Sequence, residues 1–261
     1  MTSLDTPKTL ASTYLSELRD TAEIRGIFSD ILIGRNGELR GFLSYDRNVV
    51  DRLNDAARLK TTGPAALYRG LIVQSVSVFE NFVKELASAT IALNVNRAGR
   101  YSSLSDKFRN QHAYHAGQIL THVNKGVLPG QKFGFPILMK NLGDCFSDQD
   151  SFDVMPEVFT LLMGNATPDR LENLFEKLDL PSPFNPGVGD TNAMKKVLNE
   201  TRKVPAAKLA RSELESLIKK RNTIVHGDLS LDVQQSDFQN AVDFLEAMIE
   251  ALHEVVSKQF V

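Results

Sequence analysis

The chain has 261 residues, with 30 Lys+Arg against 32 Asp+Glu, and 42% of its residues are hydrophobic. This composition is that of a globular protein and excludes wholesale disorder. The single cysteine, Cys145, excludes an internal disulfide and a four-cysteine zinc site. No apolar run approaches the ~18 residues that cross a bilayer, and the N-terminus lacks the order of a signal peptide. We therefore expect a protein of the reducing cytoplasm with no membrane partner.

The first part of the chain predicts two helices, over residues 8–33 and 45–60. A short hairpin is predicted between them, pairing Ile31–Ile33 with Leu39–Leu43. The intervening Arg35-Asn36-Gly37 contains the Asn-Gly pair that favours a tight turn.

A long amphipathic helix is predicted over Ala65–Leu93. Pro64 suits its first position, where the missing N–H would have no partner. At ~1.5 Å per residue the helix would be about 40 Å long, enough to span a domain. Its apolar residues recur at the spacing of one helix face, at Leu67, Leu71, Val78, Phe79, Phe82, Leu86 and Leu93.

Three more helices are predicted nearer the C-terminus. One begins at Thr167-Pro168-Asp169, an N-cap followed by a proline and an acid. The second runs over about Ser212–Val225, and a glycine that can stop a helix follows closely. The third has apolar residues four and three apart over Phe238–Val256, with a capping box predicted over Ser236–Gln239.

Glycine and proline mark two loops, Val127–Pro136 and Pro181–Asp190. Because strand signals are otherwise absent from the sequence, we expect an all-α protein built as a helical bundle in one domain. The predicted parts of this domain, residues 1–261, are a core at about 64–94 and 164–258, a helical elaboration inserted between core helices at 95–163, and an N-terminal helical extension at 1–60.

The most informative residue is Arg221. On a helix of about 100° per residue, it falls in the middle of the apolar stripe that includes Leu214, Leu217, Ile218 and Val225. Burying a guanidinium is costly unless an anion or a functional site compensates it. Arg221 is therefore either part of a structural ion pair or part of a site.

Asn222 and His226 lie one turn apart beside the arginine. His226 is in the last turn of the predicted helix, where the dipole favours the protonated imidazole. A histidine that gains and loses a proton near neutral pH suits acid–base catalysis, and arginine suits a phosphate. The set would suffice for RNA cleavage without a metal ion, in which the 2′-OH attacks the neighbouring phosphorus. The plain alternative is a helix-capping histidine.

The stretch Arg221-Asn222-Thr223-Ile224-Val225-His226 resembles the R-x4-H motif of the HEPN superfamily, including the Asn that commonly follows the Arg. Val78-Phe79-Glu80-Asn81-Phe82-Val83 is similar to an earlier core helix of that superfamily, and Gly164–Leu180 to its RiboL-PSP subgroup. The resemblance covers Ala65–Leu93 and about 164–258.

The resemblance implies an all-α fold, a homodimer and a composite site in which two R-x4-H motifs face each other. It implies a metal-independent endoribonuclease that uses no cofactor, of the kind that acts as a toxin or antiphage defence effector, with an antitoxin or regulatory partner. Other members bind RNA or nucleotides without cutting. One subgroup carries a Tyr two residues after the His as the target of an antitoxin nucleotidyltransferase. Asp228 stands there in this chain, so that form of regulation is not expected.

Two further features bear on RNA. Glu80, on the partly apolar flank of the long helix, could pair with Arg221 and orient it, or be an ordinary solvated acid. Residues 195–221 hold nine Lys/Arg against three Asp/Glu, and Lys219 and Lys220 within them are candidate RNA contacts. The alternative is a solvated charged face. The near-zero total charge argues only against indiscriminate coating of RNA.

Other candidates point to structure. His112, His115 and His122 have a spacing that a metal could use, but no acid completes the set, so we expect surface histidines and no metal site. Cys145 is expected in the core. Gly187-Val188-Gly189 lacks the strand–turn–helix setting of a dinucleotide loop.

Three hypotheses of different classes follow from the sequence. The first is a dimeric RNA-cleaving enzyme that uses Arg221, Asn222 and His226. The second is a HEPN module that binds RNA or nucleotides without cutting. The third is a helical adaptor in which Arg221 belongs only to an ion pair.

Overall fold

The computed structural model describes all residues except 1–2, 34–62, 125–133, 148–151, 228–230 and 261. Within these residues every regular element is helical, which confirms the all-α prediction. Four long helices dominate: α1 (Asp5–Ile33), α4 (Gly63–Ala98), α10 (Lys203–Val225) and α11 (Gln235–Ser257).

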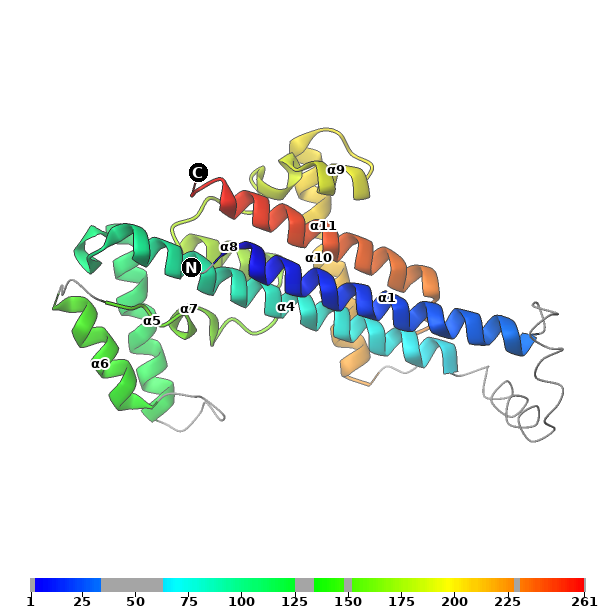
Figure 1. The fold of residues 1–261 in the computed structure, drawn as a ribbon, viewed down its shortest axis with the longest axis horizontal. Coiled ribbons are helices and arrows are strands. Elements are labelled where there is room, and N and C mark those ends of the chain that lie inside the picture. The colour runs from blue at the N-terminus through cyan, green and yellow to red at the C-terminus, as the bar shows by residue number, and fades with distance from the viewer. Residues whose placement is uncertain (1–2, 34–62, 125–133, 148–151, 228–230, 261) are drawn as a thin grey trace.

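The longest helix, α4, has 36 residues and extends over about 54 Å. Helices α1 and α11 run beside it along the long axis of the molecule, and α10 crosses them steeply (Figure 1). Their apolar faces form one contiguous core, in which Phe79, Leu214 and Phe238 are fully buried. The helices form because apolar residues recur along one face, and this burial stabilises them.

A group of shorter helices stands at the C-terminal end of α4 (Figure 1). It consists of a 3-10 turn, η2 (Tyr101–Ser103), then α5 (Asp106–Asn124), α6 (Phe135–Phe146) and the single turn α7 (Glu157–Thr160). Cys145 of α6 is buried and its thiol donates a hydrogen bond to the carbonyl of Asp153 at 3.1 Å, so the prediction of a core cysteine is confirmed.

The remaining elements connect this group to α10. They are α8 (Pro168–Lys177), the 3-10 turn η3 (Gly187–Asp190) and α9 (Asn192–Val197). At Gly189 the chain passes so close to α10 that an added Cβ would overlap the backbone of Lys203 and Ala207. The sequence predicted a plain loop at 181–190, and the structure adds one helical turn at its end.

One prediction for the N-terminal part is wrong, and others fall on residues that the structure does not describe. Residues 31–33 are the last turn of α1 and not a strand, so the hairpin prediction is wrong. The apolar pair at 31 and 33 mimicked strand alternation, but it continues a helix of 29 residues. The predicted partner strand at 39–43 and the helix at 45–60 lie outside the described residues, as does most of the predicted loop at 127–136.

Helix boundaries near the C-terminus also differ from the predictions. Helix α10 begins at Lys203, nine residues before the predicted start, because Ala206, Ala207 and Ala210 continue its buried face. The capping box of α11 lies two residues earlier than predicted: the Asp237 carboxylate accepts the N–H of Gln234 at 2.9 Å. Within the described part of the chain, no helix has the length and apolar character needed to cross a membrane.

The histidines of α5 are also placed differently from the prediction. His112 is fully buried and His115 is nearly so, whereas surface positions were expected. His112 lies against Tyr101 and Phe159, with ring centroids 5.7 and 6.0 Å away. An imidazole can fill an aromatic cluster of this kind, and helical spacing alone does not distinguish that role from a solvated one.

Candidate functional site

Arg221 lies on the face of α10 that packs toward α4. Its side chain is 19% exposed, so the guanidinium is largely removed from water, as its place on the apolar stripe predicted. The compensating anion is Glu80 of α4, whose carboxylate lies 3.6 Å from Arg221 Nη2 and whose side chain is 13% exposed. The structure thus brings these two predicted residues together.

Glu80 is itself held by a third segment. The loop that precedes α8 donates the backbone N–H of Ala166 to Glu80 Oε1 at 3.3 Å. Each carboxylate oxygen therefore has a different partner, and the carboxylate joins α4 to both the loop and α10. A mostly buried charge pair with such added contacts fixes geometry, which is its best-attested use in proteins.

Asn222 turns its side chain toward the same network. Its Oδ1 accepts hydrogen bonds from Arg221 Nη1 at 3.0 Å and from Asn165 Nδ2 at 3.1 Å. Arg221 Nη1 also lies 3.5 Å from Asn165 Oδ1. Asn165 was not predicted as a site residue, although it belongs to the Gly164–Leu180 stretch whose resemblance to a HEPN subgroup was noted.

His226 caps α10 and its backbone N–H bonds to the carbonyl of Asn222 at 2.9 Å. Its imidazole is exposed and makes no hydrogen bond or ion pair with the described part of the chain. It opens onto a groove of about 510 Å³ between α10 and the start of α8. The groove is lined by Thr167, Glu215, Ile218, Lys219, Asn222, Thr223 and His226.

The two predicted lysine contacts have different surroundings. Lys219 is exposed and lines the groove. Lys220 faces α11, where its Nζ lies 3.3 Å from Asp237. The pKa of Asp237 is lowered, first by the N–H of Gln234 and then by Lys220. Lys220 is therefore engaged within the fold, and only Lys219 is placed to meet a ligand in the groove.

The exposed Val225 corrects another prediction. It was placed on the buried stripe with Arg221, but 53% of it is exposed, because it is the last residue of α10. Ile224 remains partly packed against the core.

Arg211 braces α8 against α10. Its guanidinium bonds to Glu172 at 3.2 Å and to Asp169, both on α8. The Glu172 hydrogen bond is the main cause of its raised pKa, and Asp169 adds to it. Since the loop carrying Asn165 leads directly into α8, this brace also limits how far that loop can move from Arg221.

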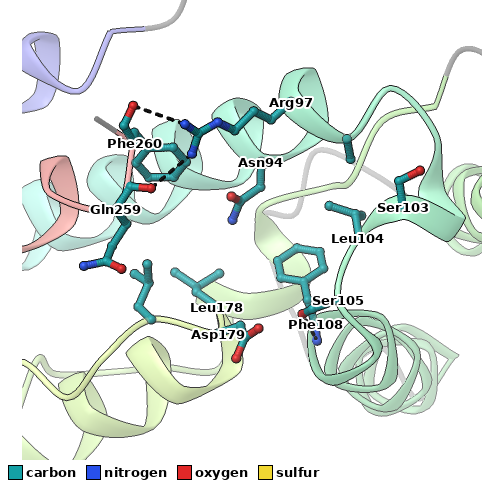
Figure 2. Close-up of a pocket in the computed structure, with 12 residues that line it drawn as sticks. Asn94, Arg97, Ser103, Leu104, Ser105, Phe108, Leu178, Asp179, Gln259 and Phe260 are labelled. Carbon is teal, nitrogen blue, oxygen red and sulfur yellow. Dashed lines mark hydrogen bonds between the residues drawn. The ribbon is translucent and has the colours of Figure 1, made fainter.

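A second cavity, of about 380 Å³, lies at the far end of α4 (Figure 2). Its polar wall includes Arg97, but this guanidinium already donates to the carbonyls of Gln259 and Phe260 at 3.1 and 3.4 Å. It also lies over the Phe260 ring, 5.6 Å from the centroid. These contacts hold the C-terminal residues against α4, and the cavity brings together no set of catalytic groups comparable to that near Arg221.

Within the described residues, no three His, Cys, Asp or Glu side chains converge as they would around a metal ion. His112 and His115 are instead engaged in local packing. His112 Nδ1 lies 2.9 Å from the Tyr101 hydroxyl, and His115 contacts Gln118 and Gln111 at 3.0 and 3.1 Å.

The protein comparisons identify the family of the chain. A family model described as RiboL-PSP-HEPN matches residues 42–258, which include Glu80, Asn165 and Arg221. No curated protein and no solved structure matches the chain. Because the matched segment covers most of the sequence and contains the predicted motif helix, the chain belongs to the RiboL-PSP-HEPN family of the HEPN superfamily.

Proposed function

We propose that the protein is a metal-independent endoribonuclease whose active site is shared by two copies of the chain. The observation that carries the proposal is that Asn222 and His226 line one groove of α10, while the Arg221 guanidinium behind them bonds to Asn222 and is oriented by Glu80. HEPN domains are commonly nucleases, and family membership supports the same conclusion. Arg221, Asn222 and His226 are proposed as the catalytic residues, Glu80 as their support, and Lys219 and Lys220 as RNA contacts.

In the proposed reaction, the 2′-oxygen of one nucleotide attacks the adjacent phosphorus. The P–O2′ bond forms and the P–O5′ bond breaks, which leaves a 2′,3′-cyclic phosphate and a 5′-hydroxyl. A base takes the 2′-OH proton, and an acid protonates the departing 5′-oxygen. Arg221 stabilises the charge that grows on the non-bridging oxygens. No metal ion, water or cofactor is consumed.

This chemistry explains why two copies are proposed. One imidazole cannot accept one proton and donate another in the same step, but the same histidine of a second copy can supply the missing role. His226 is exposed beside the uncovered Val225, so a second chain can approach it there. The biological role proposed is that of a toxin or antiphage effector in the cytoplasm, controlled by an antitoxin or regulatory partner.

The test uses mixed RNAs in excess EDTA with wild type, His226→Ala and Arg221→Ala, and with His122→Ala on α5 as the matched histidine control. Wild type and the control should cleave and leave 2′,3′-cyclic phosphate ends. Each site variant should lose about 10²–10⁴-fold in rate, the usual contribution of a positioned acid or base or of an oxyanion-stabilising group. Equal cleavage by wild type and His226→Ala, or cleavage that EDTA abolishes, would contradict the proposal.

One observation favours a second candidate function, an RNA- or nucleotide-binding module that does not cut. The His226 ring has no partner in the described part of the chain to orient it, whereas catalytic histidines are normally held in place. RNA binding without cleavage by a dimeric wild-type protein would support this alternative. Neither binding nor cleavage would leave the Arg221–Glu80 pair as a structural ion pair in a helical adaptor.

A further inference from the structure

Arg221 determines the orientation of two side-chain amides. A guanidinium carries only N–H donors, so any amide atom that bonds to it must be oxygen. Arg221 Nη1 meets Asn222 at 3.0 Å and Asn165 at 3.5 Å, and both contacts therefore identify Oδ1. This assignment follows from the chemistry of the donor and does not depend on telling nitrogen from oxygen by position.

The orientation of Asn165 then fixes Asn222 a second time. With Oδ1 directed at Arg221, Asn165 turns its Nδ2 toward Asn222 Oδ1, where the donor and acceptor are 3.1 Å apart. Asn222 Oδ1 thus accepts hydrogen bonds from two donors. Turning the amide over would place Asn222 Nδ2, itself a donor, against the same two N–H groups. The amide is locked with its oxygen inward.

The nitrogen of Asn222 is left for the groove. Asn222 lines the groove together with Lys219 and His226. Its Nδ2 makes no hydrogen bond with the described part of the chain, although Oδ1 makes two. The groove therefore presents an amide N–H₂, an ammonium and an imidazole near one another, a set of donors that suits an anionic oxygen.

Asn165 sits in a loop whose conformation is held from several sides. Gly164, at φ +62°, adopts the left-handed conformation that glycine accepts without strain. The guanidinium of Arg170 packs where a side chain at 164 would lie, and it donates to the Asn165 carbonyl at 3.4 Å. The next residue, Ala166, is bonded to Glu80. The Asn165 amide is thus presented by an anchored loop.

We propose that Asn165 is a positioning residue: it holds the Asn222 amide so that Nδ2 points into the groove and donates a hydrogen bond to an RNA phosphate. The identity of the ligand as RNA rests on the proposed function. The positioning of the Asn222 amide by Asn165 is independent of that function.

The first experiment uses the full chain without RNA and with ¹⁵N-labelled asparagine. NMR should show rapid solvent exchange of the Asn222 Nδ2 protons and slower exchange of those of Asn165. In Asn165→Asp a carboxylate oxygen replaces the donor and repels Asn222 Oδ1, so the Asn222 amide should be displaced and its side-chain resonance should shift. The matched control is Asn141→Asp, whose amide bonds to the carbonyl of Asp153 in a different region. An unchanged Asn222 resonance in Asn165→Asp overturns the inference.

The second experiment is a double-mutant cycle on RNA cleavage with Asn165→Ala, Asn222→Ala and both. Each single variant should reduce kcat/KM about tenfold or more, the effect of losing one hydrogen bond to a charged group. The double variant should be no worse than Asn222→Ala, because the proposed effect of Asn165 on cleavage passes through Asn222. Additive losses, or a wild-type rate in Asn165→Ala, overturn the inference and leave the nuclease proposal intact. If wild type never cleaves RNA but the Asn222 resonance shifts in Asn165→Asp, the proposed function is refuted and the positioning of Asn222 is supported.

Discussion

The buried His112 makes the protein sensitive to mild acid. Its ring is fully buried, and burial lowers the pKa from 6.5 to about 4. The Tyr101 hydroxyl meets Nδ1, but Nε2 is buried without a partner in the described part of the chain. A proton added to the ring would therefore place a positive charge in a buried site, where loss of hydration disfavours the charged form.

The size of the effect follows from the two pKa values. The unfolded chain takes up the proton below pH 6.5, whereas the folded protein does so only below about pH 4. Folding stability is therefore lost as the pH falls through this window and is unaffected by this group above it. The full shift corresponds to about 3 kcal/mol, of which about 2.5 kcal/mol is lost by pH 4.5. His115, whose pKa is lowered by burial and secondarily by Lys177, acts in the same direction.

The assay is urea unfolding at pH 7 and pH 4.5 for wild type, His112→Asn and His122→Asn. Asparagine can present a polar atom to Tyr101 in place of Nδ1 and does not titrate. The loss in unfolding free energy between the two pH values should be about 2.5 kcal/mol smaller in His112→Asn than in wild type. Carboxylates that titrate in this range are common to all three proteins and cancel. Equal losses in wild type and His112→Asn would refute the argument.

Three other outcomes are expected. Gly189→Ala should lower the free energy of unfolding by about 1–3 kcal/mol, because the added methyl group overlaps the backbone of α10. The control Gly117→Ala, whose methyl group meets nothing within 4 Å, should raise it slightly, and thermal melts of the two variants compare these effects. Phe238→Ala should cost about 3–5 kcal/mol in chemical denaturation, since the ring is fully buried. Glu80→Gln should lower both kcat/KM for RNA and the free energy of unfolding, because it leaves the mostly buried Arg221 guanidinium without its anion; an unaltered kcat/KM would argue against an orienting role.

The long helices were predictable because each buries a broad face, and burial leaves a periodic trace in the sequence. Helix α4 was recognised with its start one residue late and its end five residues early, and α11 with all but its first residues. The errors fell where the pattern is short or ambiguous. The alanines that extend α10 toward its N-terminus carry a weak hydrophobic signal, and the strand predicted at residues 31–33 rested on three residues.

The site was predictable only in part. An arginine among apolar residues is visible in one helix, and the sequence therefore pointed to Arg221. Its amide partner was not visible, because Asn165 is 57 positions from Asn222 and reaches it through tertiary folding. Arg170 is only five positions from Asn165, but its contact depends on the left-handed backbone at Gly164, which helical periodicity does not show.

The Arg221 network can form only late in the synthesis of the chain. It needs α4, the loop before α8 and α10 at the same time, and the contact between Ala166 and Glu80 already spans 86 positions. A chain still emerging from the ribosome can form the first two parts while Arg221, Asn222 and His226 are inside the exit tunnel or not yet made. The groove lined by α10 cannot form, or bind any ligand, until α10 has emerged and packed. The architecture therefore delays the site's assembly during translation without any separate inhibitor.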